Sequence, residues 1–179
     1  MHARQVPGQN IRSFSGPHSS LDIMAGKVPS EPTPQHKRLD IFLGRWSIEG
    51  QNSENAPGAS GARIIGEELY DWLPGNFFLS YHWVHRMEDH SHKGVGILGY
   101  NVESAEYFAH NYDNMGYVRH YHVHVEADTW TVSGDYERAR IVFSIDGRNM
   151  RVNWEILKQG KSWMPLCEWN AIKVNSATP

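Results

Sequence analysis

The densest group of potential metal ligands in this sequence is a run of alternating histidines, His120, His122 and His124. In an extended strand, residues at alternate positions share one face, so the three imidazoles would lie side by side. His-x-His is also a recurring spacing of metal ligands in β-barrels. The expected pairing across the following turn, however, directs them outward beside Thr131 and Ser133, where no nearby carboxylate or Cys completes a site. We interpret them as an exposed histidine stripe, and a divalent-metal site remains the alternative.

The best candidate for acid–base chemistry is His110, which the strand pattern places on the inward face. Arg119 and Tyr112 are expected beside it, with Asp113 near the rim. An imidazole oriented by such neighbours titrates near neutral pH and can act as a general acid or base, while the Arg stabilises a developing enolate. The competing interpretation is a core histidine that only satisfies the hydrogen bonds of a buried Tyr or Arg.

The remaining chemically active side chains point to less specific roles. His85 lies near the end of a predicted strand, where a core residue explains it well, and His90 and His92 lie in a predicted, solvated loop. The single Cys167 is expected to point inward, as a buried structural thiol rather than a nucleophile. No nucleophile elbow, Cys-x-x-Cys or His-Glu-x-x-His motif occurs, so the chain carries none of these catalytic signatures.

The composition is that of one globular domain. A chain of 179 residues with 40% hydrophobic and 21% charged residues is long enough to bury a core. Its aromatic share of 12%, with seven Trp and eight Tyr, favours strands and an aromatic pocket. A formal net charge of -3 and the lack of a Lys/Arg run argue against binding to nucleic acids or anionic membranes.

We also expect a cytoplasmic protein. A single cysteine cannot form an internal disulfide, which is compatible with a reducing compartment. The first ten residues, MHARQVPGQN, lack the apolar core of a signal peptide, and no apolar run approaches the length that spans a membrane.

The chain divides into residues 1–32, which we predict to be a mobile N-terminal arm rich in Gly, Pro, Ser and His, and a folded domain over residues 33–179. Thr33 is a suitable N-cap and Pro34 suits the first helical position, so a short helix is expected to begin there. Gly44 ends it. This helix would plug one end of the structure that follows.

After the plug helix the hydrophobic period changes to two, and turn signals recur about every ten residues. This pattern predicts an all-β meander of about ten antiparallel strands, and closing the meander into an up-and-down barrel removes its exposed edges. The strands are expected near 45–51, 63–72, 76–86, 94–100, 105–113, 117–126, 129–135, 137–145, 149–157 and 163–174.

The Asp-Gly turn at 146–147 is the strongest short hairpin signal in the chain. It sets Phe143 opposite Met150 on an apolar face, and Arg138 opposite Glu155 on a polar face with matched charges. The apolar face must therefore be the core.

The same procedure at three further turns sets the following residues opposite each other: His110 and Arg119, Trp72 and Phe77, Trp154 and Pro165. The inward face is then mostly aromatic and aliphatic with a few polar groups, which is typical of a small-molecule pocket. The residues expected to contact a ligand are Trp46, Tyr70, Trp72, Tyr81, Trp83, His85, Phe108, Tyr121, Trp130 and Trp154.

At the start of the first predicted strand, directly after the plug helix, stands Gly44-Arg45-Trp46. This triplet resembles the Gly-x-Trp signature of lipocalins and the wider calycin superfamily. The resemblance implies that Trp46 closes one barrel end and stacks on a basic residue of the last strand. Lys173 has the inward position that this role requires, although Arg is usual there.

Several longer segments extend the similarity. They are LDIFLGRW (39–46), YDWLPGNFF (70–78), GYN (99–101), YFAHNYDNMG (107–116) and the final strand. Together they resemble the bacterial calycin-like family known as domain of unknown function 1579, over roughly residues 36–174. The resemblance implies a lipocalin-like barrel, and because that family has no established activity, it implies no catalytic residues.

These observations predict an intracellular protein that binds a hydrophobic or aromatic small molecule inside a lipocalin-like barrel. The alternative is a cofactor-free pocket enzyme of the isomerase, cyclase or lyase type, in which His110 transfers a proton with the help of Arg119 and Tyr112. A third hypothesis is binding of haem or of a metal ion; otherwise no cofactor is predicted. A homodimer is compatible with the sequence, and no nucleic-acid or membrane partner is expected.

Overall fold

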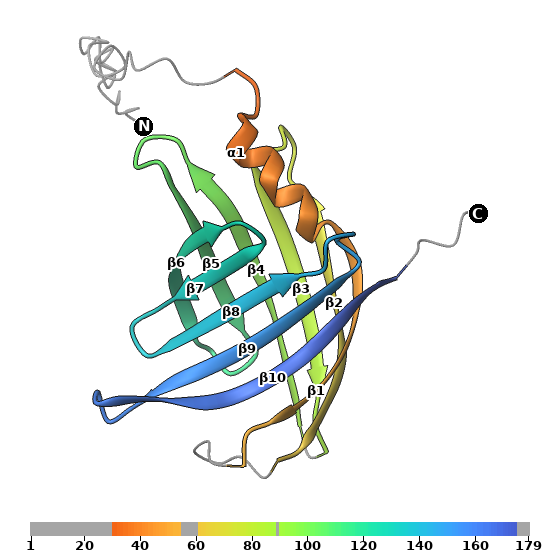
Figure 1. Ribbon diagram of the computed structural model, residues 1–179, viewed down its shortest axis with the longest axis vertical. Coiled ribbons are helices and arrows are strands. Elements are labelled where there is room, and N and C mark those ends of the chain that lie inside the picture. Colours follow the sequence, from red (N-terminus) through yellow and green to blue (C-terminus); the bar gives the residue numbers. More distant parts are fainter. Residues whose placement is uncertain (1–29, 55–60, 89, 175–179) are drawn as a thin grey trace, which may run out of the picture. The chain divides into compact units, whose positions relative to one another are not determined.

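The computed structural model describes residues 30–54, 61–88 and 90–174. Within them, ten antiparallel strands close into one barrel, in which each strand pairs with its neighbours in the chain and the last pairs with the first (Figure 1). The predicted ten-stranded up-and-down barrel is therefore confirmed. Most of the predicted mobile arm, residues 1–29, lies outside the described residues.

Closure gives each of the ten described strands two partners, so none of them forms an open edge. A short helix, α1 (Pro34–Lys37), continues into the 3₁₀ helix η2 (Arg38–Phe42) before the barrel begins. The strands are β1 (Gly44–Asn52), β2 (Arg63–Trp72), β3 (Phe78–Arg86), β4 (Ser91–Asn101), β5 (Glu106–Asp113), β6 (Val118–Glu126), β7 (Thr129–Ser133), β8 (Glu137–Phe143), β9 (Asn149–Lys158) and β10 (Ser162–Val174).

The helices give the barrel a direction. Because β1 starts directly after η2, the odd-numbered strands run away from the helices and the even-numbered strands run back (Figure 1). We call the two ends of the barrel the helix end and the far end. The loops that follow odd-numbered strands, including the β5–β6 loop, lie at the far end.

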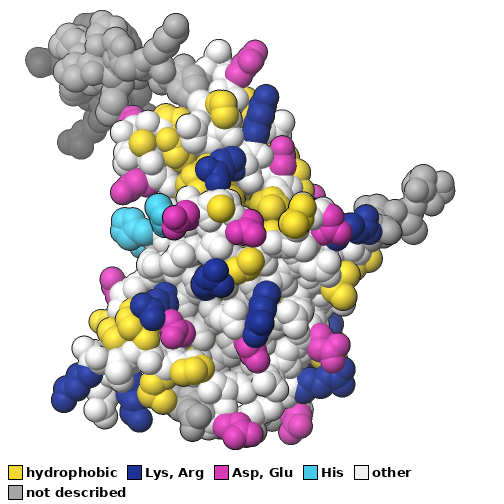
Figure 2. All heavy atoms as spheres, viewed as in Figure 1, with side chains coloured by type: hydrophobic (Ala, Val, Ile, Leu, Met, Phe, Trp, Pro, Cys, Tyr) yellow, Lys and Arg dark blue, Asp and Glu magenta, His cyan; other side chains and the backbone are white. Residues whose placement is uncertain are grey.

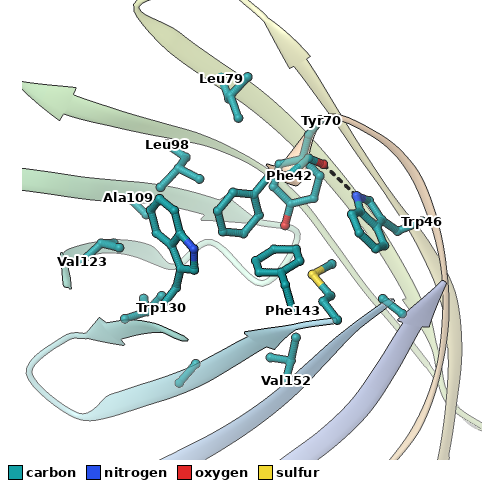
Figure 3. Packing of buried hydrophobic residues seen from close by; sticks show 14 of the residues in the cluster. Phe42, Trp46, Tyr70, Leu79, Leu98, Ala109, Val123, Trp130, Phe143 and Val152 are labelled. Carbon is teal, nitrogen blue, oxygen red and sulfur yellow. Dashed lines mark hydrogen bonds between the residues drawn. The ribbon is translucent and has the colours of Figure 1, made fainter. Parts of the chain in front are cut away.

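The segment η2 closes the helix end. Leu39 is fully buried and Phe42 is nearly so. The indole of Trp46, at the start of β1, donates a hydrogen bond of 2.7 Å to the carbonyl oxygen of Phe42 (Figure 3). The Phe42 ring packs edge-on against Trp130 and Phe143. The predicted plug is thus present, and core side chains pack against it.

The stack implied by the Gly-x-Trp triplet is also present. Trp46 lies directly opposite Lys173 in the pairing of β1 with β10, and the ammonium nitrogen lies 4.8 Å from the centroid of the indole. The same ammonium donates to the carbonyl oxygen of Ile41 at 3.2 Å. Burial and the nearby charge of Arg148 lower the pKa of Lys173. Trp46 therefore seals the barrel end.

The pairing predicted for the turn at 146–147 is confirmed. Phe143 lies opposite Met150 and both are buried, while Arg138 lies opposite Glu155 and forms an ion pair with it at 2.5 Å. On the face that Figure 2 shows, acidic and basic side chains are interspersed. Half-exposed ion pairs of this kind contribute only ~0–1 kcal/mol each, so stability must come mainly from the interior.

The pairing of β5 with β6 differs from the prediction by one residue. His110 lies opposite His120, and not opposite Arg119. The loop (113–117) holds five residues, one more than a pairing of His110 with Arg119 allows, and Gly116 adopts the left-handed region at φ +85°. A slip of one residue moves every side chain of a strand to the other face. The predicted facing of β5 was therefore wrong.

As a result, three residues expected inside the barrel lie outside it. Phe108, His110 and Tyr112 face outward, and Tyr112 is 46% exposed. The ring of His110 packs instead against that of His120, with 4.4 Å between centroids. Their neighbour Asn111 takes an inward position.

The pairing of β2 with β3 shifts by two residues. Trp72 lies opposite Leu79 rather than Phe77, because the loop is two residues longer than the predicted pairing allows. Gly75 and Asn76 both have positive φ there. An even shift keeps each side chain on its predicted face, so the lining by β2 and β3 survives the error.

The pairing of β9 with β10 is also shifted by two residues, in two steps. Lys158 pairs with Ser162 across a three-residue loop, and a bulge between Pro165 and Cys167 adds a second residue. Trp154 consequently lies opposite Cys167 rather than Pro165. Because two shifts of one residue each return a side chain to its original face, Trp154 still points into the barrel.

A candidate ligand cavity inside the barrel

The barrel contains a cavity of about 440 Å³. Small-molecule sites in proteins usually measure ~300–1,000 Å³. Phe42 caps the cavity at the helix end, and Met115, whose side chain is exposed in the β5–β6 loop, lines it at the far end. The cavity therefore extends from the plug to the surface at the far end.

Most of the predicted ligand contacts line this cavity. Trp46 and Trp72 do not, because Trp46 is part of the seal and the Trp72 indole donates to Asp40 at 3.1 Å. Phe108 faces outward through the slip of β5. The seven predicted residues that do line the cavity are Tyr70, Tyr81, Trp83, His85, Tyr121, Trp130 and Trp154.

The predicted catalytic group is not assembled. Arg119 lines the cavity, but His110 and Tyr112 lie on the outer face, so the three cannot act on one bound molecule. The predicted position of His110 inside the cavity is therefore wrong, while a proton-transfer role for this residue stays a prediction. The stripe of His120, His122 and His124 is exposed on the outer face of β6, as predicted.

Two glycines of β4 make room for rings along the wall. Gly94 lies opposite Trp83, and Gly96 lies opposite Tyr81. A Cβ on Gly94 would fall 2.1 Å from Cζ2 of the Trp83 ring, and a Cβ on Gly96 would fall 2.4 Å from Cζ of the Tyr81 ring. Both rings therefore lie against the neighbouring strand, which leaves space in the barrel centre.

These glycines belong to the run GVGILG (94–99), which has the glycine spacing of a dinucleotide-binding loop. In such a loop the glycines join a strand to the N-terminus of a helix. Here the run lies entirely within β4, and a further strand follows it. Its third glycine, Gly99, also lies against a ring, since a Cβ there would fall 2.4 Å from Cδ1 of Phe78. The spacing serves ring packing.

A buried polar group is formed by Glu68, Tyr70 and His85, which we call the Glu68 group. Nε2 of His85 lies 3.1 Å from Oε1 of Glu68, and the hydroxyl of Tyr70 donates to Oε2 at 2.9 Å. A buried carboxylate is tolerated only when such partners satisfy it. Burial, followed by the charge of Glu68, raises the pKa of Tyr70, so its hydroxyl keeps its proton.

A second polar group lies toward the far end, where β5 ends and β6 begins. It consists of Asp113, Arg119 and Glu137, and we call it the Arg119 group. The guanidinium donates to Asp113 at 2.8 Å and lies 2.7 Å from Glu137. The hydroxyl of Tyr121 donates to Glu137 as well. The charge of Arg119 is thus already matched by two carboxylates.

Asp113 is held in its ionised form. Burial by itself raises its pKa, but four donors outweigh that effect: the backbone N–H groups of Tyr117 and Met115 and the side chains of His92 and Arg119. Together they lower the pKa of Asp113. This carboxylate is therefore a fixed negative charge in the wall.

His92 corrects a further expectation. It was expected in a solvated loop, but it lies in β4, lines the cavity and approaches Asp113 at 3.4 Å. Burial lowers the pKa of His92 more than its contact with Asp113 raises it. Its neighbour His90 is exposed, in agreement with the prediction.

Two indole N–H groups in the wall have no acceptor among the described residues. They belong to Trp83 and Trp169, which are only 6% and 8% exposed and both line the cavity. The ring of His85 packs against that of Trp169, with 4.9 Å between centroids. A buried donor without a partner costs ~1–3 kcal/mol. A ligand acceptor that reaches either N–H group would recover that free energy.

Glu68, Glu137 and Asn111 are among the polar lining residues that sequence reasoning missed. Glu68 shares its face with Tyr70, and Glu137 shares its face with Ala139, so strict alternation along each strand would have identified both. Asn111, which accepts a hydrogen bond from Tyr81, was missed because the predicted register turned it outward.

In the described part of the chain, no helix is both long and apolar enough to cross a membrane. The same residues include no cluster of three or more His, Cys, Asp or Glu side chains that could hold a metal ion.

Comparisons with known proteins agree with this architecture. The model of the family described as Protein of unknown function (DUF1579) matches residues 31–162. No curated protein matches the chain. Among solved structures, the chain is similar to Rv2717c from M. tuberculosis, with 14% identity and a TM-score of 0.58 over 81% of this chain and 100% of that one. It is also similar to the S-type phycobiliprotein lyase CPES from Guillardia theta, with 12% identity and a TM-score of 0.56 over 80% and 94%. At these identities the similarity shows the fold.

Proposed function

The chain belongs to the DUF1579 family, and we propose that it binds a hydrophobic or aromatic small molecule inside its barrel. One observation carries the proposal. The interior of the barrel holds a cavity of about 440 Å³, although many bulky aromatic side chains line it. Trp83 and Tyr81 lie over glycines of β4 instead of crossing the lumen. Close-packed interiors leave few voids larger than a water molecule. A space of this size, open at one end, is therefore a binding site rather than a packing defect.

The wall supports an apolar or aromatic ligand. Aliphatic and aromatic side chains form most of it, among them Trp130, Val132 and Met150. Burying apolar ligand surface against them contributes ~25 cal/mol per Å² before the costs of association. The few polar groups of the wall are in a position to orient the ligand.

A titration with N-phenyl-1-naphthylamine, a neutral aromatic fluorophore that brightens in apolar surroundings, tests the proposal. We expect saturable binding of one molecule per chain. Ala109→Phe places a ring in the cavity and should abolish binding, whereas His110→Phe, the next residue on the outer face of the same strand, should leave it unchanged.

Val132→Phe is a second cavity-filling variant, which keeps the test valid if Ala109→Phe does not fold. Circular dichroism and thermal melting identify the folded variants. Equal binding by the folded filled variants and the wild type would show that the probe binds elsewhere. No binding by the wild type, together with no bound mass after incubation with metabolite extract in native mass spectrometry, would refute the proposal.

General acid–base catalysis is a second candidate function, and His85 supports it. This histidine lies in the cavity wall, and Glu68 orients its ring through Nε2. An imidazole fixed in this way can exchange protons with a bound molecule. Once native mass spectrometry identifies the ligand, equal turnover by the wild type and His85→Gln would contradict this role. Haem binding stays a prediction, and its measure is a Soret band after haemin addition.

A further inference from the structure

We infer that the cavity selects aromatic ligands without negative charge that present a neutral hydrogen-bond acceptor, such as a carbonyl, ether or ring nitrogen, to the indole N–H groups of Trp83 and Trp169. The inference rests on the proposed binding function and specifies the chemical class of the ligand. Two independent features of the wall carry it: its charge balance and its unpaired donors.

The charge balance of the lining is negative. The described residues that line the cavity include three carboxylates, Glu68, Asp113 and Glu137, and one guanidinium, Arg119. With neutral histidines, the lining has a net charge of -2.

The only guanidinium of this lining is also not free to receive an anion. Arg119 contacts both Asp113 at 2.8 Å and Glu137 at 2.7 Å, and the Asp113 side chain is only 2% exposed. A ligand carboxylate or sulfonate would lose its hydration and would have to compete with two fixed carboxylates for one cation. An anionic ligand is therefore disfavoured, in contrast to a neutral one of the same shape.

The unpaired donors indicate which group a neutral ligand should carry. The Nε1 atoms of Trp83 and Trp169 are buried and have no acceptor among the described residues. A neutral acceptor satisfies such a donor without bringing a charge toward Glu68, whose own oxygens already contact His85 and Tyr70. The glycine opposite Trp83 holds this ring against the wall, so its N–H is fixed in place before the ligand arrives.

A matched pair of probes tests the charge requirement at pH 8. N-phenyl-1-naphthylamine and 8-anilino-1-naphthalenesulfonate share one aromatic skeleton and differ by a sulfonate. We expect the neutral probe to bind at least tenfold more tightly. Glu137→Gln should reduce this difference in affinity, because the sulfonate probe should bind more tightly. Glu68→Gln removes a second carboxylate and replaces the first variant if that one does not fold.

A neutral naphthyl ketone, 6-propionyl-2-dimethylaminonaphthalene, tests the acceptor requirement, because a hydrogen bond to its carbonyl shifts its emission to longer wavelength. Trp83→Phe and Trp169→Phe remove one indole N–H each. At least one of them should weaken binding of the ketone about tenfold and shift its emission to shorter wavelength. Trp72→Phe is the matched control, since the Trp72 indole lies outside the cavity and bonds to Asp40.

The probe experiments distinguish an error in the proposed ligand class from an error in the proposed binding function. Equal affinity for the two anilinonaphthalenes would overturn the charge requirement while leaving the binding function intact. Unchanged ketone affinity and emission in both folded tryptophan variants would overturn the acceptor requirement. Failure of all three probes to bind the wild type, together with no bound mass after incubation with metabolite extract, would instead contradict the proposed function.

Discussion

The imidazole of His85 in β3 lies 3.1 Å from the carboxylate of Glu68 in β2, and both side chains are more than nine-tenths buried. Glu68 pairs directly with Trp83, so the contact to His85 is a diagonal one across the two strands. Glu68, Trp83 and His85 all line the cavity. Each partner is therefore costly to remove alone, because His85 would lose this buried contact and Glu68 would keep only its hydrogen bond from Tyr70.

Glu68→Ala should lower the free energy of unfolding by ~2–4 kcal/mol, because the variant leaves His85 and the hydroxyl of Tyr70 without their shared acceptor. Urea denaturation followed by circular dichroism measures this loss. Glu67→Ala, the adjacent and half-exposed carboxylate paired with Arg45, should cost less than about 1 kcal/mol. Equal losses of unfolding free energy in the two variants would mean that the buried contact contributes no more than the exposed ion pair.

Gly94→Val should displace the ring of Trp83 from the wall. The new Cβ would fall 2.1 Å from that ring, so the indole must swing toward the lumen or the strands must separate. We expect a loss of ~1–3 kcal/mol in stability and a marked loss of binding of N-phenyl-1-naphthylamine. Lys93→Val, at the neighbouring exposed position, is the control. Wild-type binding by Gly94→Val would show that this glycine does not keep the cavity open.

Asp113 should stabilise the fold in a pH-dependent way. Its pKa is lower in the folded chain than its ordinary value, so its contribution is present above that ordinary value and is lost as pH falls through the lowered one. Asp113→Asn should therefore cost ~1–3 kcal/mol at pH 7, and the difference from the wild type should shrink below about pH 4. Urea titrations at pH 7, 4 and 3 measure it, and a difference that grows on acidification would contradict the assignment.

Cys167 should be unreactive in the folded protein. Burial, and then the charge of Glu137, raise the pKa of its thiol to about 12, and the thiol was expected to be buried and structural. Since the thiolate is the nucleophile, alkylation by iodoacetamide at pH 8 should be slower than for an ordinary thiol by about two to three orders of magnitude. Mass spectrometry of native and urea-unfolded protein compares the rates. Similar rates in both states would show that this thiol is accessible.

Several features of the molecule followed from sequence patterns alone. The alternation of apolar residues and the spacing of turns predicted ten strands in the observed order, because a strand and a tight turn are local structures. The Asp-Gly turn at 146–147 predicted the pairing of β8 with β9 residue by residue. In addition, the family resemblance carried by the Gly-x-Trp triplet implied the contact between Trp46 and Lys173, residues that lie at opposite ends of the barrel sequence.

The candidate site was less accessible to such reasoning. Seven of the ten predicted ligand contacts line the cavity, because even-numbered shifts in two hairpins left the facing of their strands unchanged. The predicted position of His110 inside the cavity was wrong, because the hairpin of β5 and β6 is shifted by one residue. Loop length decides this, and the loop at 113–117 differs from the predicted turn by a single residue.

The sequence by itself determined the barrel, its plug and most of its aromatic lining, since these depend on periodicity and on turn residues that act locally. Only the tertiary structure decided which polar groups face the cavity, and that its centre is open. Both depend on contacts between strands. His85 contacts Glu68 between β3 and β2, and Gly94 leaves room for the ring of Trp83 between β4 and β3. The register of neighbouring strands sets such contacts, and a change of one residue in a loop is enough to invert them.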